Sequence, residues 1–142
     1  MLSESMPYEK KFIDVNGRKI AYVDEGSGDP IVLLHGNPTS SFLWRNVAPE
    51  LLDSDRVIIP DLIGHGDSEK LPESDGPERY TLEVAYNYLS GLLHAIGVSA
   101  NVALVIHHWG SALGFMWAMR NSTAVRGVAY MEGIVAPVSW DD

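Results

Sequence analysis

Three things are absent or scarce in this sequence of 142 residues: cysteine, positive charge and long apolar runs. The absence of cysteine excludes disulfide bonds, thiolate zinc sites and cysteine nucleophiles. The 10 basic residues are outnumbered by 19 acidic ones, which gives a formal net charge of −9. Because nucleic acids and anionic membranes are bound by basic surfaces, we expect neither among the partners of this protein.

The apolar stretches, such as residues 102–106, fall far short of the roughly 20 residues that cross a bilayer. The N-terminal sequence MLSESMPYEKK lacks the apolar segment of a secretory signal peptide. Together with the absence of cysteine, which fits a reducing compartment, these features predict a soluble, cytoplasmic protein. With 46% hydrophobic residues, the chain is long enough to bury a real core.

Short apolar runs alternate with helical patterns, which indicates an α/β domain with a largely parallel sheet. The first two strands differ from the rest, because residues 11–15 and 19–24 flank Asn16-Gly17, a dipeptide typical of tight hairpin turns. We expect these two strands to be antiparallel. Further strands are expected at 31–34, 57–60, 102–106 and 127–131.

Three helices are expected between these strands. The second begins after Thr81, whose hydroxyl can cap it, and ends before Gly97; the third spans 111–120. The first follows Pro38, with Thr39, Ser40 or Ser41 as its cap and an apolar face made of Phe42, Leu43, Val47, Leu51 and Leu52.

Reactive groups in an open parallel sheet gather at the carboxyl ends of the strands. The segment VIHHWGS, residues 105–111, has the order of strand, sharp turn and helix that defines a nucleophile elbow. The N-terminus of the following helix directs N–H groups and partial positive charge at this turn, which suits an anion. An elbow of this kind requires Ser, Cys or Asp at position 108, whereas this chain has His108.

Several of the candidate residues also have a plain structural interpretation. Asn37 suits an Asx-type turn before Pro38, Ser111 a helix cap or packing residue, and Glu132 a buried acid paired with a loop N–H. The sequence HGDS at 65–68 is typical of a turn. We expect no metal site, because adjacent histidines on a strand, such as His107 and His108, point to opposite faces.

Four segments resemble the haloalkane dehalogenases of the α/β-hydrolase superfamily in sequence, order and spacing: HGNPTSSFLWRN, PDLIGHGDSEK, VIHHWGSALGFMWA and GVAYMEGI. The resemblance runs from about Lys11 to the last residue, covers the amino-terminal half of that family, and extends to its luciferase-like relatives. It implies an α/β-hydrolase core, a mostly parallel sheet with helices on both faces. Residues 1–142 would form the amino-terminal part of one such domain, with its first six strands and without the cap and the last two strands.

The resemblance also implies a cofactor-free reaction. In the family, the elbow carries an Asp that displaces halide from carbon, and a His-activated water hydrolyses the resulting ester. His108 stands at that Asp position. Asn37 and Trp109 match the residues whose side chains bind the halide and whose backbone N–H groups form the oxyanion hole. Glu132 matches the acid that orients the catalytic base in one branch of the family, but the base itself has no counterpart.

The substitution at the elbow predicts a chain that is inactive or very weak as a dehalogenase. No Asp or Glu lies between Glu83 and Glu132 that could replace the nucleophile. An imidazole at position 108 that displaced halide would form an N-alkyl product with no acyl carbon for water to attack. The reaction would then stop after one turnover.

Three functions therefore stay open at this point: an impaired dehalogenase, a non-catalytic fragment used for binding or reconstitution, and a luciferase-like relative. The partners implied are a halogenated alkane, a halide ion, and either a complementary carboxyl-terminal half or a second copy of the chain. The last expectation rests on the sixth strand, one side of which would be an open edge.

Overall fold

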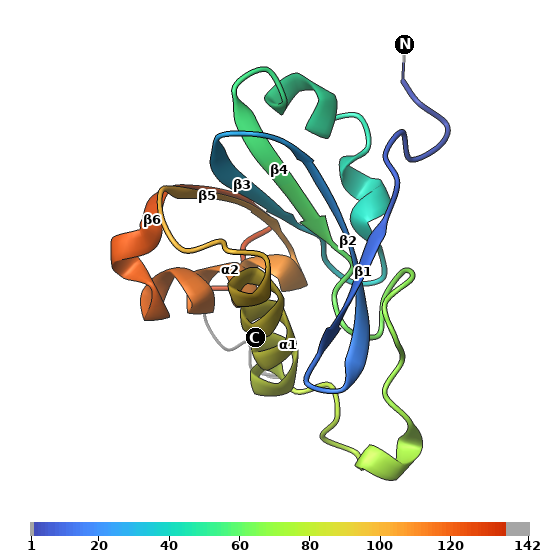
Figure 1. Cartoon of the computed structure of the whole chain (residues 1–142). Coiled ribbons are helices and arrows are strands. Elements are labelled where there is room, and N and C mark those ends of the chain that lie inside the picture. The colour runs from blue at the N-terminus through green and yellow to red at the C-terminus, as the bar shows by residue number, and fades with distance from the viewer. Residues whose placement is uncertain (1, 136–142) are drawn as a thin grey trace.

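The computed structural model describes residues 2–135 and contains one six-stranded sheet with the order β1-β2-β4-β3-β5-β6 (Figure 1). The β3–β4, β3–β5 and β5–β6 pairs are parallel, which confirms the predicted α/β fold with a mostly parallel sheet. The strands are β1 Lys11–Val15, β2 Arg18–Gly26, β3 Asp29–Leu34, β4 Asp55–Pro60, β5 Val102–His107 and β6 Val125–Met131.

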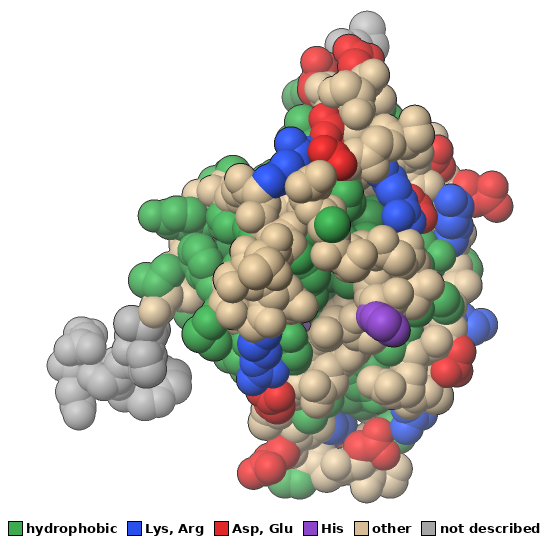
Figure 2. Space-filling model, turned by 60° about the vertical axis from the view of Figure 1, so that its left-hand side comes forward, with side chains coloured by type: hydrophobic (Ala, Val, Ile, Leu, Met, Phe, Trp, Pro, Cys, Tyr) green, Lys and Arg blue, Asp and Glu red, His purple; other side chains and the backbone are tan. Residues whose placement is uncertain are grey.

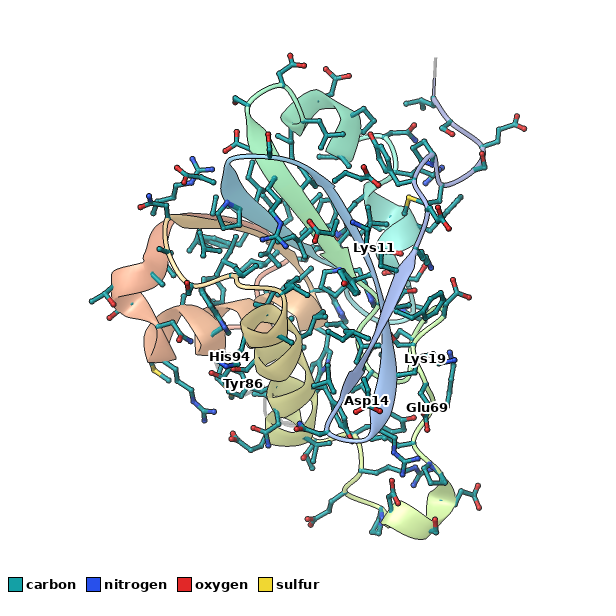
Figure 3. The ribbon with its side chains drawn as sticks, in the orientation of Figure 1. Lys11, Asp14, Lys19, Glu69, Tyr86 and His94 are labelled. Atoms are coloured by element: carbon teal, nitrogen blue, oxygen red, sulfur yellow. The ribbon has the colours of Figure 1, made fainter. Side chains whose placement is uncertain are left out.

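The hairpin at the start of the sheet is confirmed. β1 and β2 pair antiparallel, and Asn16 and Gly17 adopt the positive φ angles, 53° and 76°, that a tight turn needs. Glu69 joins the hairpin to the loop after β4, because its carboxylate accepts hydrogen bonds from the Lys19 backbone N–H at 3.0 Å and from Arg18 at 2.8 Å. Figure 3 marks Lys19 and Glu69 at this junction.

Two α-helices, α1 Leu82–Ala95 and α2 Trp109–Arg120, pack on one face of the sheet and share its larger hydrophobic core (Figure 1). The predicted bounds of α1 are confirmed: the Thr81 hydroxyl accepts from the Val84 backbone N–H, and Gly97 follows the helix with φ of 76°. Two short 3₁₀ turns, η3 Glu73–Asp75 and η4 Ser122–Ala124, lie in the connections before α1 and after α2.

The helix predicted after Pro38 is wrong. The structure has two 3₁₀ segments there, η1 Ser41–Trp44 and η2 Ala48–Leu51. The reason is Pro49, which lacks the N–H that a continuous α-helix would donate to the carbonyl four residues earlier. In the structure Pro49 lies in the first turn of η2, where this N–H is not needed. Of the possible caps, Ser40 is the one used, and its hydroxyl accepts from the Phe42 N–H at 3.3 Å.

The apolar face expected for that helix is confirmed in part, since Leu43, Leu51 and Leu52 pack against the core on the second face of the sheet. The other two predicted residues do not belong to it. Phe42 and Val47 are 41% and 40% exposed, whereas Trp44 and Ala48 are buried against the second face of the sheet. Helical elements therefore cover both faces, as predicted. Within residues 2–135, the second face is covered by these short turns and by the N-terminal segment with Met6 and Tyr8.

β6 is the outermost strand on its side of the sheet. Six of its seven residues are exposed, and three of them are large and apolar: Val128, Tyr130 and Met131. In space-filling view, hydrophobic side chains are exposed over part of this side of the molecule (Figure 2). No helix in the described range 2–135 is both long enough and apolar enough to span a membrane.

Candidate active site

The predicted elbow is present between β5 and α2. β5 ends at His107, α2 begins at Trp109, and His108 between them has φ of 51° and ψ of −122°. A non-glycine residue rarely adopts such a positive φ, and residues held in this way cluster at functional sites. The helix begins two residues earlier than predicted, so the elbow crosses from strand to helix through a single residue.

Two glycines permit this crossing. A Cβ atom on Gly36 would lie 2.5 Å from the Cβ of His108, and one on Gly110 would lie 2.4 Å from the carbonyl oxygen of His35. Real Cβ atoms do not approach other atoms this closely, so only glycine fits at either position. The loop after β3 and the elbow after β5 are thereby pressed against each other at the carboxyl end of the sheet.

Ser111 stabilises the elbow through hydrogen bonds of its side chain. Its buried hydroxyl donates to the His108 carbonyl at 2.5 Å and accepts from the Ile134 backbone N–H at 2.7 Å. The His108 N–H in turn donates to the Met131 carbonyl at 3.2 Å. Of the two structural interpretations of Ser111, the structure favours the packing residue, because the N-cap position of α2 is His108.

The side chain of His108 is an imidazole, so it cannot form the ester that a carboxylate at the elbow would form. Its Nδ1 atom is buried and has no hydrogen-bond partner within residues 2–135. The carboxylate of Glu132 contacts a different imidazole: it lies 3.0 Å from Nε2 of His107. The side chain of Glu132 is 71% exposed, so the interpretation of Glu132 as a buried acid is wrong.

A cavity of about 400 Å³ opens beside the elbow. Both residues expected to bind halide line it, Asn37 from the loop after β3 and Trp109 from the first turn of α2. Neither His108 nor Glu132 is among its described lining residues, which are Asn37, Leu62, Ile63, Gly64, His65, Tyr80, Ala85 and Trp109. The structure thus brings Asn37 and Trp109 to one cavity, and the nucleophile position His108 and the acid Glu132 are not among the residues described as lining it.

The loop after β4 adds a residue that sequence reasoning missed. His65, assigned only to a turn, lines the cavity and hydrogen-bonds through Nε2 to the side-chain oxygen of Asn37. The Asn37 side chain therefore bonds to a residue 28 positions away and not to its own turn. The sequence offered one signal for this role. His65 follows β4, whose carboxyl end lies next to that of β3, and reactive groups gather at the carboxyl ends of parallel strands.

His35 is a satisfied core residue. It is completely buried, its Nε2 accepts the Leu62 backbone N–H at 3.0 Å, and its Nδ1 lies 2.9 Å from the Gly36 carbonyl. The first contact makes Nε2 the acceptor, so the proton sits on Nδ1. Burial lowers the pKa of His35 to about 4, and the ring is neutral at pH 7.

Within the described part of the chain, no group of three or more His, Asp or Glu side chains is arranged to hold a metal ion. A second, apolar groove of about 550 Å³ adjoins the first cavity across Trp109. Its walls come from α1, α2 and the segment after β6, with Leu82, Trp109, Ala112, Phe115, Met116, Met119, Ile134 and Val135.

The elbow, the parallel sheet and the cavity at its carboxyl edge are those of a hydrolase of the α/β class. Residues 29–142 match the family model described as the alpha/beta hydrolase fold, and the chain belongs to this family. Within it, the chain is similar to haloalkane dehalogenases. It is 54% identical over 134 residues to a haloalkane dehalogenase of Sphingobium indicum, and 45% identical over 139 residues to one of Mycolicibacterium smegmatis.

The structural comparison agrees. The haloalkane dehalogenase DatA from Agrobacterium tumefaciens C58 superposes with a TM-score of 0.82 at 39% identity, over 92% of this chain and 43% of that one. The two sequence relatives are matched over 94% and 97% of this chain, but over only 45% and 44% of their own length. The chain therefore spans slightly less than half of the proteins that it resembles.

Proposed function

We propose that this chain carries the halide-binding part of a haloalkane-dehalogenase-type site, and that its own turnover of haloalkanes is absent or very weak. The observation that carries the proposal is the cavity beside the elbow, which Asn37 and Trp109 line from two different loops. An indole N–H can only donate a hydrogen bond, and an amide nitrogen donates as well, so together they suit an anion.

The proposed weakness follows from His108. In the family reaction, a carboxylate at this position displaces halide and forms an ester that water can open. If the imidazole of His108 attacks the carbon instead, the C–N bond forms as the C–X bond breaks and halide leaves with the electron pair. The product is an N-alkyl histidine that has no acyl carbon, so the chain would release at most one halide per molecule.

The exposure of Glu132 favours a role for a second polypeptide in the proposed reaction. Its carboxylate is exposed at the end of β6, where it is accessible to a partner that supplies the catalytic base. We propose that a complementary carboxyl-terminal half supplies that base, and that halogenated alkane, halide and this half are the partners of the chain. No cofactor takes part in the proposed reaction, and its proposed location is the cytoplasm.

Halide release from a simple bromoalkane tests the proposal. The chain is combined with the carboxyl-terminal remainder of the Sphingobium indicum relative, and wild type is compared with His108→Asp. We expect no more than one bromide per chain from the wild type and multiple turnovers from the variant. The matched control is His94→Asp, the same change on the exposed side of α1, which should behave as wild type.

Two results would contradict the proposal: appreciable multiple turnover by the wild-type chain, or a folded His108→Asp complex without activity. Bromide titration followed by tryptophan fluorescence tests the binding part alone. Trp109→Phe removes the indole N–H while keeping an aromatic ring, and we expect it to weaken bromide binding. A chain that binds halide without turnover would serve as a binding or reconstitution component, which is the second candidate function.

A further inference from the structure

The side chain of His65 is held between two oxygen atoms. Nδ1 lies 3.1 Å from the carbonyl oxygen of Ile63, and Nε2 contacts the side-chain oxygen of Asn37. A backbone carbonyl can only accept a hydrogen bond, so the contact with Ile63 requires a proton on Nδ1. The second ring nitrogen, Nε2, is then the only place where the protonation of His65 can change while this contact is kept.

The proton on Nε2 determines which end of the Asn37 amide faces the imidazole. When Nε2 carries a proton, it donates to the oxygen of Asn37, as in the structure, and the amide nitrogen is left for the cavity. When Nε2 has no proton, it can only accept, so the amide must turn its nitrogen toward His65. The oxygen of Asn37 then faces the cavity, where it would repel an anion.

We propose that His65 is a positioning residue that couples halide binding in this cavity to the uptake of one proton. The inference rests on the proposed function and adds its regulation: the doubly protonated imidazole selects the Asn37 orientation that donates to halide. The positive charge of this imidazole also favours an anion in the cavity, because its described lining residues include no Asp, Glu, Lys or Arg.

The charged and titratable groups around His65 do not offer a simpler source of this coupling. The ring of His35 lies 5.3 Å away and is neutral at pH 7, because burial lowers its pKa to about 4. Tyr80, the other titratable lining residue, accepts a hydrogen bond from Leu71. Of the other charges near this loop, Lys10 pairs with Asp61 and Asp67, Glu69 pairs with Arg18, and Lys70 donates to the Gly66 carbonyl.

His108 is a further imidazole near the loop that contains Asn37, because it packs against Gly36. It does not line the cavity as described, and its Nδ1 has no partner within residues 2–135. A pH dependence caused by His108 would survive a substitution of His65, and one caused by His65 would survive His108→Gln. The two sources are therefore separable by experiment.

The test is bromide binding to the 142-residue chain, measured by calorimetry between about pH 5 and 8, where imidazole side chains change charge, at constant ionic strength. For wild type we expect the affinity to fall by up to about tenfold per pH unit as the pH rises. Buffers of different ionisation enthalpy should report the uptake of up to one proton per bromide. His65→Gln can still donate to Asn37 but does not titrate, so its binding should be nearly independent of pH.

His94→Gln is the matched control, because His94 lies on α1 with an exposed side chain (Figure 3) and should leave the wild-type slope unchanged. If folded His65→Gln keeps the wild-type slope, the inference is wrong and the proposed function stands. If wild type binds no bromide at any pH, the proposed function fails and the inference fails with it.

A measurement on the wild-type chain covers the case in which His65→Gln does not fold. The ¹⁵N resonances of the His65 ring report which nitrogen carries a proton. We expect a proton on Nδ1 in both forms, with Nε2 gaining one when bromide is added. A neutral form protonated on Nε2, or ring resonances unaffected by saturating bromide, would overturn the inference.

Discussion

The carboxylate of Asp61, which is completely buried, lies 2.6 Å from the ammonium group of Lys10, 51 residues away in the chain. The same carboxylate accepts the backbone N–H groups of Ser41 at 2.8 Å and Asp67 at 2.9 Å. It thereby ties the N-terminal segment and the start of η1 to the loop that carries His65. Burial by itself favours the neutral acid, but the hydrogen bonds from Lys10, Asp67 and Ser41 outweigh it and hold the pKa of Asp61 below its ordinary value.

Replacing Asp61 by Asn should therefore destabilise the chain. The change leaves the Lys10 ammonium without its buried partner, and breaking a buried ion pair in this way costs about 3 kcal/mol. Urea unfolding at pH 7 measures the loss. Asp67→Asn is the control, since it removes the exposed partner of the same lysine and should cost less than about 1 kcal/mol. Equal losses in the two variants would contradict the role given to Asp61.

Acid should destabilise the chain through His35. Its pKa in the folded state is about 4, below the value of about 6.5 in the unfolded chain, so the unfolded state binds the proton first. The contribution is fully present above about pH 6.5 and is lost as the pH falls toward 4, by about 3 kcal/mol in total. Unfolding free energies across this pH range measure the effect. His35→Gln should flatten the dependence and His94→Gln should not; similar slopes in all three chains would refute it.

Gly110→Ala should destabilise the elbow despite the better helix propensity of alanine. The propensity gain is about 1 kcal/mol at most, whereas a methyl group would lie 2.4 Å from the His35 carbonyl oxygen and 2.7 Å from that of Leu34. Forcing an atom into a packed site of this kind costs about 1–3 kcal/mol. We expect a lower melting temperature and weaker bromide binding.

The matched control for this variant is Gly127→Ala in β6. A Cβ atom there meets nothing within 4 Å, so its unfolding free energy should change by less than about 0.5 kcal/mol. Equal stability of Gly110→Ala and Gly127→Ala would contradict the close approach between the loop after β3 and the elbow after β5.

The exposed edge strand should make the 142-residue chain self-associate. Unpaired backbone groups on an edge strand pair readily with another chain, and a lysine on such a strand opposes this. Val128, 38% exposed on β6, is a suitable position. We expect Val128→Lys to lower the weight-average mass in sedimentation, and Leu2→Lys, at a residue that is 80% exposed, to have no effect. A monodisperse wild-type monomer would contradict this expectation.

Much of the fold could be predicted from local signals. The turn at Asn16-Gly17, the cap at Thr81 and the glycine after α1 each act within a few residues, and each is where the sequence predicted it. The prediction of a helix after Pro38 was wrong because that segment depends on more than local signals. Its apolar spacing suited a helix, but Pro49 and the burial of Trp44 decided the outcome, and spacing does not reveal which side chain the sheet will cover.

The candidate site was predictable only in part. Asn37 and Trp109 were placed by resemblance, and the structure brings them to one cavity. The contact between His65 and Asn37 depends on the path of the loop after β4, which the buried Asp61 and Ser68 fix through contacts far apart in sequence. No local pattern carries that information, so the sequence HGDS by itself predicts a turn and no contact with Asn37.

The contacts that fix the backbone at position 108 do not determine which side chain stands there. The bonds that hold position 108 to Met131 and Ser111 use main-chain atoms of His108, so neither of these contacts depends on which side chain stands there. One codon change can therefore exchange the chemistry of the elbow without disturbing its architecture. Selection for stability alone would not act on that exchange. A lineage could therefore lose or regain its nucleophile while keeping the same fold.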